Sequence, residues 1–173
     1  MVDAVADFEG RVTWAFEKAV NELCESEIER LMLAELLFCP FGYHAGPHTI
    51  RSPSASISVD GNVLIIPQLA IGRYRADFAV LIKNFAGDVL QMVVECDGHD
   101  FHEKTKVQAQ RDKKRDRDMQ RAGWQVFRFT GSEIFKDISE CVGELDVHVA
   151  NWIERDLVKR GIIGRRGKDN GAK

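Results

Sequence analysis

Apolar residues recur along the chain with two periods, and each period predicts one kind of element. Spacing of three to four residues is typical of amphipathic helices, and short apolar runs bounded by turn residues are typical of buried strands. The first pattern predicts helices over residues 5–23, 26–38, 103–122 and 142–159, with a helical turn starting at Glu133. The second predicts strands over residues 63–67, 73–82, 89–94 with Glu95 and Asp97 at the strand end, and 124–129. This order predicts an α/β sandwich in which a three-strand meander is followed by a crossover helix and another strand.

Capping and turn residues mark several of these boundaries. Ser26 is the expected N-cap of the second helix, and Gly123 is the expected C-cap of the third. Residues 84–88 form a turn, so we expect the strands on either side of it to pair as a tight antiparallel hairpin. Residues 41–62 are rich in Gly, Pro, Ser and His and predict a long loop, with a short strand near residues 55–59.

Acidic residues interrupt the apolar runs at two places. The run over residues 89–94 ends in Glu95 and Asp97, which share one face of the predicted strand because side chains alternate with period two. Asp77 is expected in the middle of the strand over residues 73–82, flanked by apolar residues. Buried charges are costly unless something pairs with them. These acids therefore either form ion pairs with Arg or Lys or surround a cation.

Basic and polar partners for these acids can be anticipated. An ion pair of Asp77 with Arg75 or Arg128 is one alternative, and Arg128 is expected as a structural partner of the acids rather than as a catalyst. One face of the helix over residues 103–122 is half polar, which predicts that the N-terminal half of this helix covers the strand-end carboxylates. The residues of that face are Gln108, Asp112, Arg115, Met119 and Ala122.

Length and charge bound the domain organisation. The chain has 173 residues, of which 45% are hydrophobic and 29% charged, and this suits one globular domain. We expect a single domain over residues 1–160 and a flexible basic tail over residues 161–173. The net charge of −3 does not indicate nucleic-acid binding, but residues 104–121 carry eight Lys or Arg against three Asp. Such a run is either a solvated helix face or a phosphate-binding surface.

Neither a membrane segment nor a secretory signal is indicated. No apolar run approaches the roughly 18–20 residues of a membrane span, and acidic residues lie where a signal peptide would be basic. The four cysteines are scattered without a CxxC pair, which argues against a zinc site or a disulfide framework. The sequence therefore predicts a cytoplasmic protein with reduced thiols and no membrane partner.

Six oxygen- or nitrogen-bearing residues are candidates for a metal site: Glu29, Asp77, Glu95, Asp97, His99 and His102. Oxygen-rich sets suit hard cations, above all Mg²⁺, which takes one or two carboxylates and leaves its other positions to water and substrate phosphate. Such an ion promotes phosphoryl-group chemistry. Spacing alone makes this interpretation suggestive rather than specific.

An ordered series of motifs is more specific than any of these features alone. In chain order the motifs are Ser26-Glu27-Ile28-Glu29, Ile66-Pro67-Gln68, Gly72-Arg73-Tyr74-Arg75-Ala76-Asp77-Phe78, Val94-Glu95-Cys96-Asp97-Gly98-His99-Asp100-Phe101-His102, Arg111-Asp112, Arg115-Asp116, Gly123-Trp124 and Val126-Phe127-Arg128-Phe129. Over roughly residues 26–140, this series resembles the very-short-patch-repair-like branch of the PD-(D/E)xK nuclease superfamily. The resemblance implies the restriction-endonuclease-like fold, a three-layer sandwich with a central mixed sheet between helices. It also implies Mg²⁺, with Mn²⁺ as a substitute, where two strands meet.

The resemblance implies roles for individual residues. Asp77 would be the metal-bridging aspartate, Glu95 the second acid, and the backbone carbonyl of Cys96 a further metal ligand. Glu29 would be an accessory acid, acting directly or through water. Asp97 stands where the superfamily's lysine usually is, so the identity of the general base is open.

The remaining candidates would assist these acids. His99 or His102 could orient water or protonate the leaving oxygen. The alternatives are a turn residue without chemistry for His99 and a helix N-cap for His102. Lys104 and Lys106 could supply the positive charge of the missing lysine. The residues expected to support the acids or contact phosphate are Gln68, Arg75, Lys104, Gln108, Asp112 and Arg115.

These features together predict a Mg²⁺-dependent endonuclease that hydrolyses phosphodiester bonds. DNA is the expected substrate, with RNA as the alternative. The rival hypothesis is a nucleic-acid-binding module on the same fold whose chemistry is dormant, prompted by the missing lysine. A subunit that cuts only with a partner protein, or as a homodimer, is a further alternative.

Overall fold

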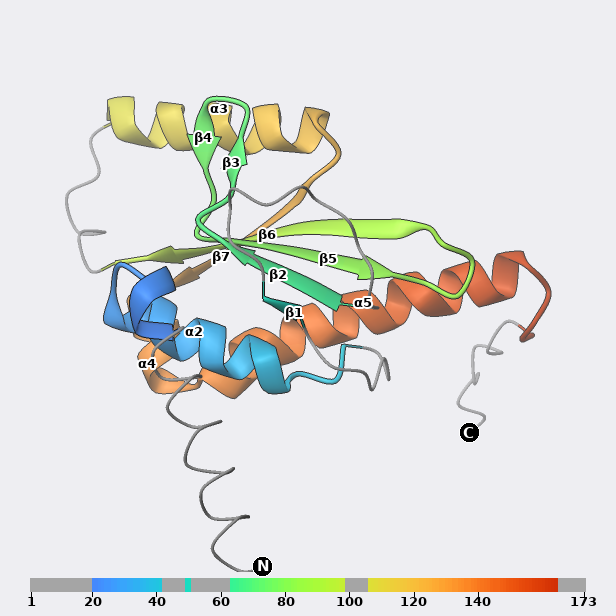
Figure 1. The fold of residues 1–173 in the computed structure, drawn as a ribbon. Coiled ribbons are helices and arrows are strands. Elements are labelled where there is room, and N and C mark those ends of the chain that lie inside the picture. Colours follow the sequence, from blue (N-terminus) through green and yellow to red (C-terminus); the bar gives the residue numbers. More distant parts are fainter. Residues whose placement is uncertain (1–19, 42–48, 51–62, 99–105, 165–173) are drawn as a thin grey trace, which may run out of the picture.

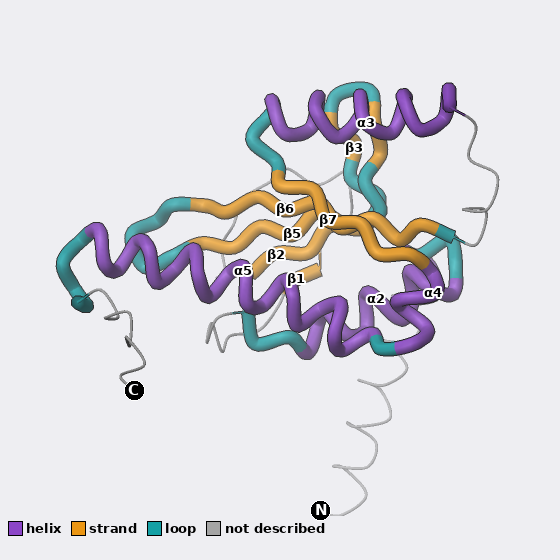
Figure 2. The backbone as a smooth tube through the Cα atoms, turned by 180° about the vertical axis from the view of Figure 1, so that it is seen from behind, coloured by secondary structure: helices purple, strands orange, loops and turns teal. Residues whose placement is uncertain are grey.

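The computed structural model describes residues 20–41, 49–50, 63–98 and 106–164 (Figure 1). Within these residues, the centre is a mixed five-stranded sheet with the order β1-β2-β5-β6-β7. The strands are β1 (Thr49–Ile50), β2 (Val63–Pro67), β5 (Phe78–Lys83), β6 (Val89–Asp97) and β7 (Gln125–Thr130). The helices are α2 (Glu27–Phe38), α3 (Lys106–Arg121), α4 (Gly131–Lys136) and α5 (Ile138–Lys159). Helices α2, α4 and α5 lie on one side of the sheet and α3 lies on the other, which confirms the predicted three-layer α/β sandwich (Figures 1 and 2).

Strand pairing brings the acid-bearing end of β6 next to β7. Strand β5 pairs antiparallel with both β2 and β6, so the predicted hairpin is confirmed. Strand β7 pairs parallel with β6, and α3 makes the crossover that such a pair requires. In this register Glu95 lies opposite Arg128, and Asp97 lies opposite Thr130. The parallel pair therefore places a basic residue beside the acids.

Alternation along β6 divides the interior between the two faces of the sheet. Met92 and Val94 are fully buried in the larger core, which contains residues of α2, α4 and α5. Val93 lies in the smaller core, which contains a residue of α3. Glu95 and Asp97 follow Val93 at intervals of two residues, so they point to the same side of the sheet as Val93.

Helix ends agree with the capping residues of the sequence. The Oγ atom of Ser26 accepts a hydrogen bond of 3.3 Å from the Glu29 amide at the start of α2. Gly123, which follows α3, has a φ of +91°, as expected of a glycine C-cap. Helix α5 begins at Ile138, earlier than predicted, because the Asp137 side chain caps it by accepting a hydrogen bond from the helix backbone.

The predicted continuous strand over residues 73–82 is wrong. The chain instead leaves the sheet in a short hairpin, residues 68–77, which we call the arm (Figure 1). Its two strands, β3 (Ala70–Ile71) and β4 (Tyr74–Arg75), pair antiparallel with each other in a separate sheet. Asp77 therefore lies at a bend between β4 and β5, and the expected face shared by Arg75, Asp77 and Ala79 does not exist.

Two residues with positive φ make the arm possible. Gln68 has a φ of 55° where the chain leaves β2, and Gly72 has a φ of 59° at the tip, where glycine tolerates this conformation best. The Gln68 amide donates a hydrogen bond of 2.8 Å to the Asp77 carbonyl and so closes the base of the arm. The two ends of the arm, Gln68 and Asp77, are therefore held together by this backbone hydrogen bond.

Two predicted elements fall partly or wholly outside the described residues. The helix over residues 5–23 is described only from residue 20, and residues 20–23 are helical. The strand near residues 55–59 lies outside the described residues. Strand β1, which the sequence did not predict, pairs parallel with β2.

The structure also bears on the membrane and disulfide predictions. None of the helices in the described part of the chain combines the length and the apolar character that a bilayer crossing demands. All four cysteines are free thiols, so no disulfide contributes to the fold.

Candidate metal and phosphodiester site

Asp77 is attached directly to the acid-bearing strand. Its Oδ2 atom accepts a hydrogen bond of 2.7 Å from the backbone amide of Cys96 on β6. Because Cys96 lies between Glu95 and Asp97, this contact fixes Asp77 beside the end of β6 that carries both acids. The thiol of Cys96 packs instead against the larger core on the opposite face, as expected from the alternation.

Glu95 is buried and is held by an arginine of α3. Its side chain is 3% exposed, and its Oε1 atom lies 2.6 Å from Nη2 of Arg115. The same nitrogen donates a hydrogen bond of 2.5 Å to the carbonyl of Arg75 in the arm. Arg115 therefore links α3, β6 and the arm. The helix covers the carboxylates as predicted, but this contact comes from its second half rather than from the expected N-terminal half.

Asp97 is held by the arginine of β7. Nη1 of Arg128 lies 3.3 Å from Oδ1 of Asp97, and Nη2 of the same guanidinium lies 2.7 Å from Asp116 of α3. Arg128 is thus a structural partner of the acids, as predicted. Asp116 belongs to the Arg115-Asp116 motif, but its place in this ion pair was not anticipated from the sequence.

Glu29 joins the site through Gln68. Its carboxylate accepts hydrogen bonds from the Glu25 amide (2.9 Å), from Ser26 Oγ (2.8 Å) and from Gln68 Nε2 (2.9 Å). Since the backbone of Gln68 also contacts Asp77, one residue connects the two acids. We call Glu29, Asp77, Glu95 and Asp97 the carboxylate site.

Two polar atoms at this site are buried without a hydrogen-bond partner among the described residues, namely Gln68 Oε1 and Arg115 Nε. Buried polar atoms in folded proteins are nearly always satisfied by protein, water or ligand. One unsatisfied atom is an acceptor and the other a donor. The site therefore holds one acceptor and one donor whose hydrogen-bonding capacity no described residue uses.

Burial and mutual repulsion act on the acids in the same direction. Burial raises the pKa of Asp77 above its ordinary range, the Cys96 amide opposes this, and the charge of Glu29 adds to it. Burial and then the charge of Asp77 raise the pKa of Glu95 to about 7, although Arg115 lowers it. The ionised carboxylates therefore destabilise one another where they stand.

The donor chemistry of the carboxylate site fits Mg²⁺, since carboxylate oxygens are the ligands that hard cations prefer. A cation would also relieve the repulsion that raises the pKa values of Asp77 and Glu95. In the described residues, however, no three His, Cys, Asp or Glu side chains are grouped closely enough to hold an ion. Arg115 supplies the positive charge beside Glu95 instead.

The remaining predicted site residues fall into two groups: some lie in the described part of the chain, and others lie outside it. Arg75 does not reach Asp77 through its side chain, because its guanidinium pairs with Glu25 at 2.6 Å on the surface. Asp112 lies partly buried on α3, and Gln108 lies in the same helix, but its side chain is outside the described residues. The residues that lie outside the described part of the chain altogether are His99, His102 and Lys104.

One cluster close to the site was missed by sequence reasoning. Arg73 and Tyr74 of the arm both contact Asp118 of α3. Arg73 and Tyr74 are part of the Gly72–Phe78 motif, and this motif is the feature of the sequence that could have pointed to the cluster. The partner on α3 is more than forty residues away in the sequence, so spacing could not reveal it.

Comparison with known proteins gives one match. The family model described as REase_MTES_1575, a restriction-endonuclease-like family, matches residues 56–149. This range includes Asp77, Glu95, Asp97 and the whole of α3. The search of curated proteins found no significant match. The search of solved structures found none either.

Proposed function

We propose that this chain, which belongs to the restriction-endonuclease-like family whose model it matches over more than half its length, is a Mg²⁺-dependent endonuclease acting on DNA. The observation that carries the proposal is the contact between Asp77 and the Cys96 amide. It holds one half-buried carboxylate against the strand that carries two more, an arrangement of like charges that a bound cation would stabilise further.

The proposed ligands are Asp77, Glu95 and the carbonyl of Cys96, with Glu29 as an accessory acid. A bound Mg²⁺ ion supplies a Lewis acid that polarises a phosphoryl oxygen and makes water a stronger nucleophile. In the hydrolysis, a water oxygen forms a bond to phosphorus and the bond from phosphorus to the leaving oxygen breaks. The proton of the water passes to a base, and the leaving oxygen takes up a proton.

Arg115 has a defined part in this proposal. Its guanidinium now occupies the side of Glu95 where an additional positive charge is favourable. A cation held by Glu95 would compete with this ion pair, and a guanidinium freed from Glu95 would be able to contact a phosphate of the substrate. Arg115 is therefore proposed to shield Glu95 in the absence of metal and to bind substrate phosphate in its presence.

The finer assignments rest on the motif resemblance. They are the very-short-patch-repair-like branch, DNA rather than RNA, and the use of His99 or His102 as the group that exchanges protons. The family match is to a restriction-endonuclease-like family and does not reach that branch. Asp97, which pairs with Arg128, is proposed as a positioning residue for the end of β6.

The rival function is a dormant nucleic-acid-binding module on the same fold. The specific observation in its favour is that two of the acids, Glu95 and Asp97, are each neutralised by an arginine. Such pairs would persist in a protein that no longer binds metal. Binding without cutting distinguishes this module from the nuclease.

The test is a cleavage assay with supercoiled plasmid and with single-stranded DNA, in Mg²⁺, in Mn²⁺ and in chelator. The variant is Asp77→Asn, and the matched control is Asp88→Asn in the exposed β5–β6 turn. We expect metal-dependent cutting that falls about 1,000-fold in Asp77→Asn, since a metal contributes several kcal/mol and each 1.4 kcal/mol is tenfold in rate. The control should cut like the wild type.

Each other outcome has a clear consequence. Cutting that survives in Asp77→Asn contradicts the assignment of the site. DNA retained in a gel shift without any cutting supports the dormant module. If the protein neither cuts nor binds DNA, both functions are contradicted and only the assignment of the fold remains.

A further inference from the structure

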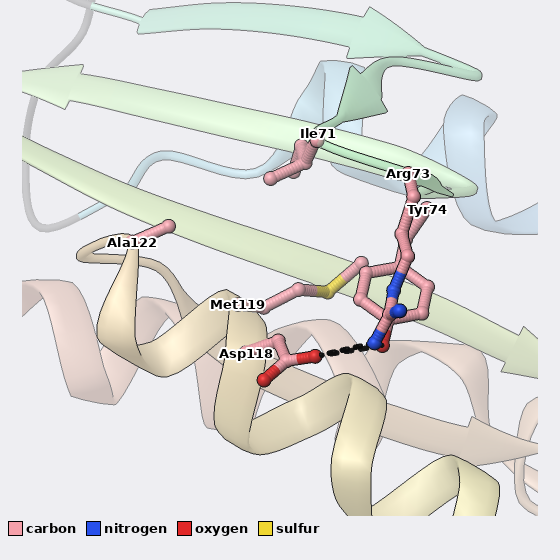
Figure 3. Close-up of a pocket in the computed structure, with 7 residues that line it drawn as sticks. Ile71, Arg73, Tyr74, Asp118, Met119 and Ala122 are labelled. Atoms are coloured by element: carbon pink, nitrogen blue, oxygen red, sulfur yellow. Dashed lines mark hydrogen bonds and ion pairs between the residues drawn. The ribbon is translucent and has the colours of Figure 1, made fainter.

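A second polar cluster lies beside the carboxylate site, where the tip of the arm meets the C-terminal half of α3. It lines a cavity of about 230 Å³. Ile71, Gly72, Arg73 and Tyr74 line it from the arm, and Asp118, Met119 and Ala122 line it from the region of α3 (Figure 3). None of these residues has a role in the metal chemistry proposed above.

The polar edge of the cavity is built from three side chains. Arg73 Nη2 lies 2.9 Å from Asp118 Oδ2, and the Tyr74 hydroxyl donates a hydrogen bond of 2.8 Å to the same oxygen (Figure 3). The guanidinium carbon of Arg73 lies 4.9 Å from the centre of the Tyr74 ring. This edge therefore combines a cation, an aromatic ring and a carboxylate acceptor in one fixed arrangement.

The remainder of the cavity is apolar. Met119 is fully buried and presents a polarisable thioether, and Ile71 and Ala122 add aliphatic surface. A phosphate alone would find a carboxylate and alkyl groups beside a single arginine, which is poor chemistry for an anion. A drug-sized ligand needs a pocket of roughly 300–1,000 Å³, so the cavity suits a single planar ring system.

The two elements that line the cavity, the arm and α3, also carry residues of the carboxylate site or of its contacts. Tyr74 is three residues before Asp77 in the arm, and Asp118 is three residues after Arg115 on α3. One helical turn and one short strand therefore separate the two sites. A ligand whose phosphodiester lies at the carboxylate site can reach the cavity with an adjacent group.

We propose that this cavity is a nucleobase subsite, which receives an unstacked base of the DNA strand whose phosphodiester lies at the carboxylate site. A base has flat faces, one of which could stack on the Tyr74 ring or on the Arg73 guanidinium that lies over that ring, and a polar edge that hydrogen-bonds to Asp118 or Arg73. The inference rests on the proposed function, because it takes DNA as the ligand. It implies that the protein binds strands with an accessible base more tightly than a continuous duplex.

A purely structural explanation assigns the same contacts to attachment of the arm to α3. The two explanations differ in what happens when the cavity is filled while the three polar side chains stay intact. Ala122→Leu does this, because Ala122 lies at the cavity rim and its own surface is exposed. The matched control is Ala86→Leu, another exposed alanine, in the β5–β6 turn.

The experiment measures binding of two labelled single strands by fluorescence anisotropy in chelator, so that the strands are not cut. One strand is a short thymidine oligonucleotide, and the other is an abasic deoxyribose-phosphate strand of equal length and charge. We expect the wild type and Ala86→Leu to prefer the thymidine strand by about tenfold, since stacking one base contributes roughly 1–3 kcal/mol. In Ala122→Leu this preference should be lost, while affinity for the abasic strand is unchanged.

The subsite is overturned if Ala122→Leu, shown to be folded by circular dichroism, keeps the wild-type preference for the thymidine strand. It is also overturned if the wild type shows no preference, or if Ala122→Leu weakens both strands equally. Should Ala122→Leu be unfolded, Ala122→Val fills less of the cavity and is held to the same criterion. Wild-type protein that binds with this preference but never cuts retains the subsite and contradicts the nuclease. The opposite result, cutting without the preference, retains the nuclease alone.

Discussion

The two faces of the sheet are built from the same strands, but one is apolar and the other carries charged residues. On the side of α2, α4 and α5, β6 contributes Met92 and Val94 to a continuous apolar core. On the side of α3, the same strand contributes Val93 and then two acids, Glu95 and Asp97. Because side chains alternate along the strand, neighbouring residues of β6 belong to an apolar face and to a charged face.

The difference favours a functional role for these acids over a stabilising one. Replacing a buried ion pair by apolar residues of similar volume is often neutral or stabilising, and the other face shows that these strands can be packed entirely with apolar residues. On the α3 face the acids are nevertheless held by specific contacts, from the Cys96 amide, Arg115 and Arg128. Retention of costly charges at one point is what a functional site requires.

The largest expected effect on stability is on the apolar face. Leu145→Ala on α5 removes a fully buried side chain from the larger core, and should lower the free energy of unfolding by about 2–5 kcal/mol. Val147→Ala on the same helix, where the side chain is largely exposed, should change it by less than about 0.5 kcal/mol. Urea unfolding of both variants measures these values.

Cleavage by the folded fraction of Leu145→Ala should be unchanged in cold buffer, because α5 covers the face of the sheet opposite to α3 (Figure 2), and Glu95 and Asp97 point to the side of α3. A loss of cleavage that exceeds the loss of folded protein would contradict the separation of the two faces.

The second effect is a pH dependence that belongs to the α3 face. The pKa of Glu95 is raised from 4.5 to about 7 in the folded protein, so between these values the folded state binds the proton more strongly than the unfolded state. Stability in chelator therefore falls as the pH rises from about 4.5 to 7, by about 2–3 kcal/mol at roughly 1.4 kcal/mol per pKa unit. The variant Glu95→Gln should lack this contribution.

The measurement is the free energy of unfolding of the wild type and of Glu95→Gln at intervals over that pH range, with chelator present. Glu144→Gln on the exposed side of α5 is the control and should follow the wild type. Parallel curves for the wild type and Glu95→Gln would show that burial of Glu95 does not disfavour its charge.

The smallest effect is expected at the surface of the arm. Arg75 and Glu25 form an ion pair in which both side chains are 57% exposed, so Arg75→Ala should lower stability by less than about 1 kcal/mol. If Arg75 contacts phosphate, as the sequence predicted, Arg75→Ala should also reduce the dependence of DNA affinity on salt by about one charge. Titrations of DNA binding at several salt concentrations check this, and an unchanged salt dependence would remove Arg75 from the binding surface.

The sequence predicted the fold well where apolar runs were long. Strands β2, β5 and β6 and helix α3 were each marked by period or by a flanking turn, and the ordered motifs added the sandwich architecture. The arm was missed because β3 and β4 have two residues each, too few for any period to show. The result was a wrong position for Asp77, which lies at a bend rather than within a strand.

Within the site, residue types were predictable but partners were not. The half-polar face of α3 indicated that this helix would cover acids, and Arg115 was expected to support them or contact phosphate. Only the fold shows that Arg115 pairs with Glu95 and contacts the arm carbonyl. The link from Glu29 through Gln68 to Asp77 joins segments nearly forty residues apart. Such contacts depend on how the layers pack, which local pattern does not encode.

The central claim is that the charges on the α3 face are held for a cation, and metal-dependent stability tests it most directly. The thermal unfolding midpoint is measured with increasing Mg²⁺ at pH 8. This pH is above the Glu95 pKa of about 7, so the Glu95 carboxyl is ionised. An ion that binds only the folded state raises the midpoint by mass action. We predict that Mg²⁺ raises the midpoint of the wild type and of Glu144→Gln, but not that of Glu95→Gln. Equal shifts in all three proteins, or no shift in any of them, would contradict the claim.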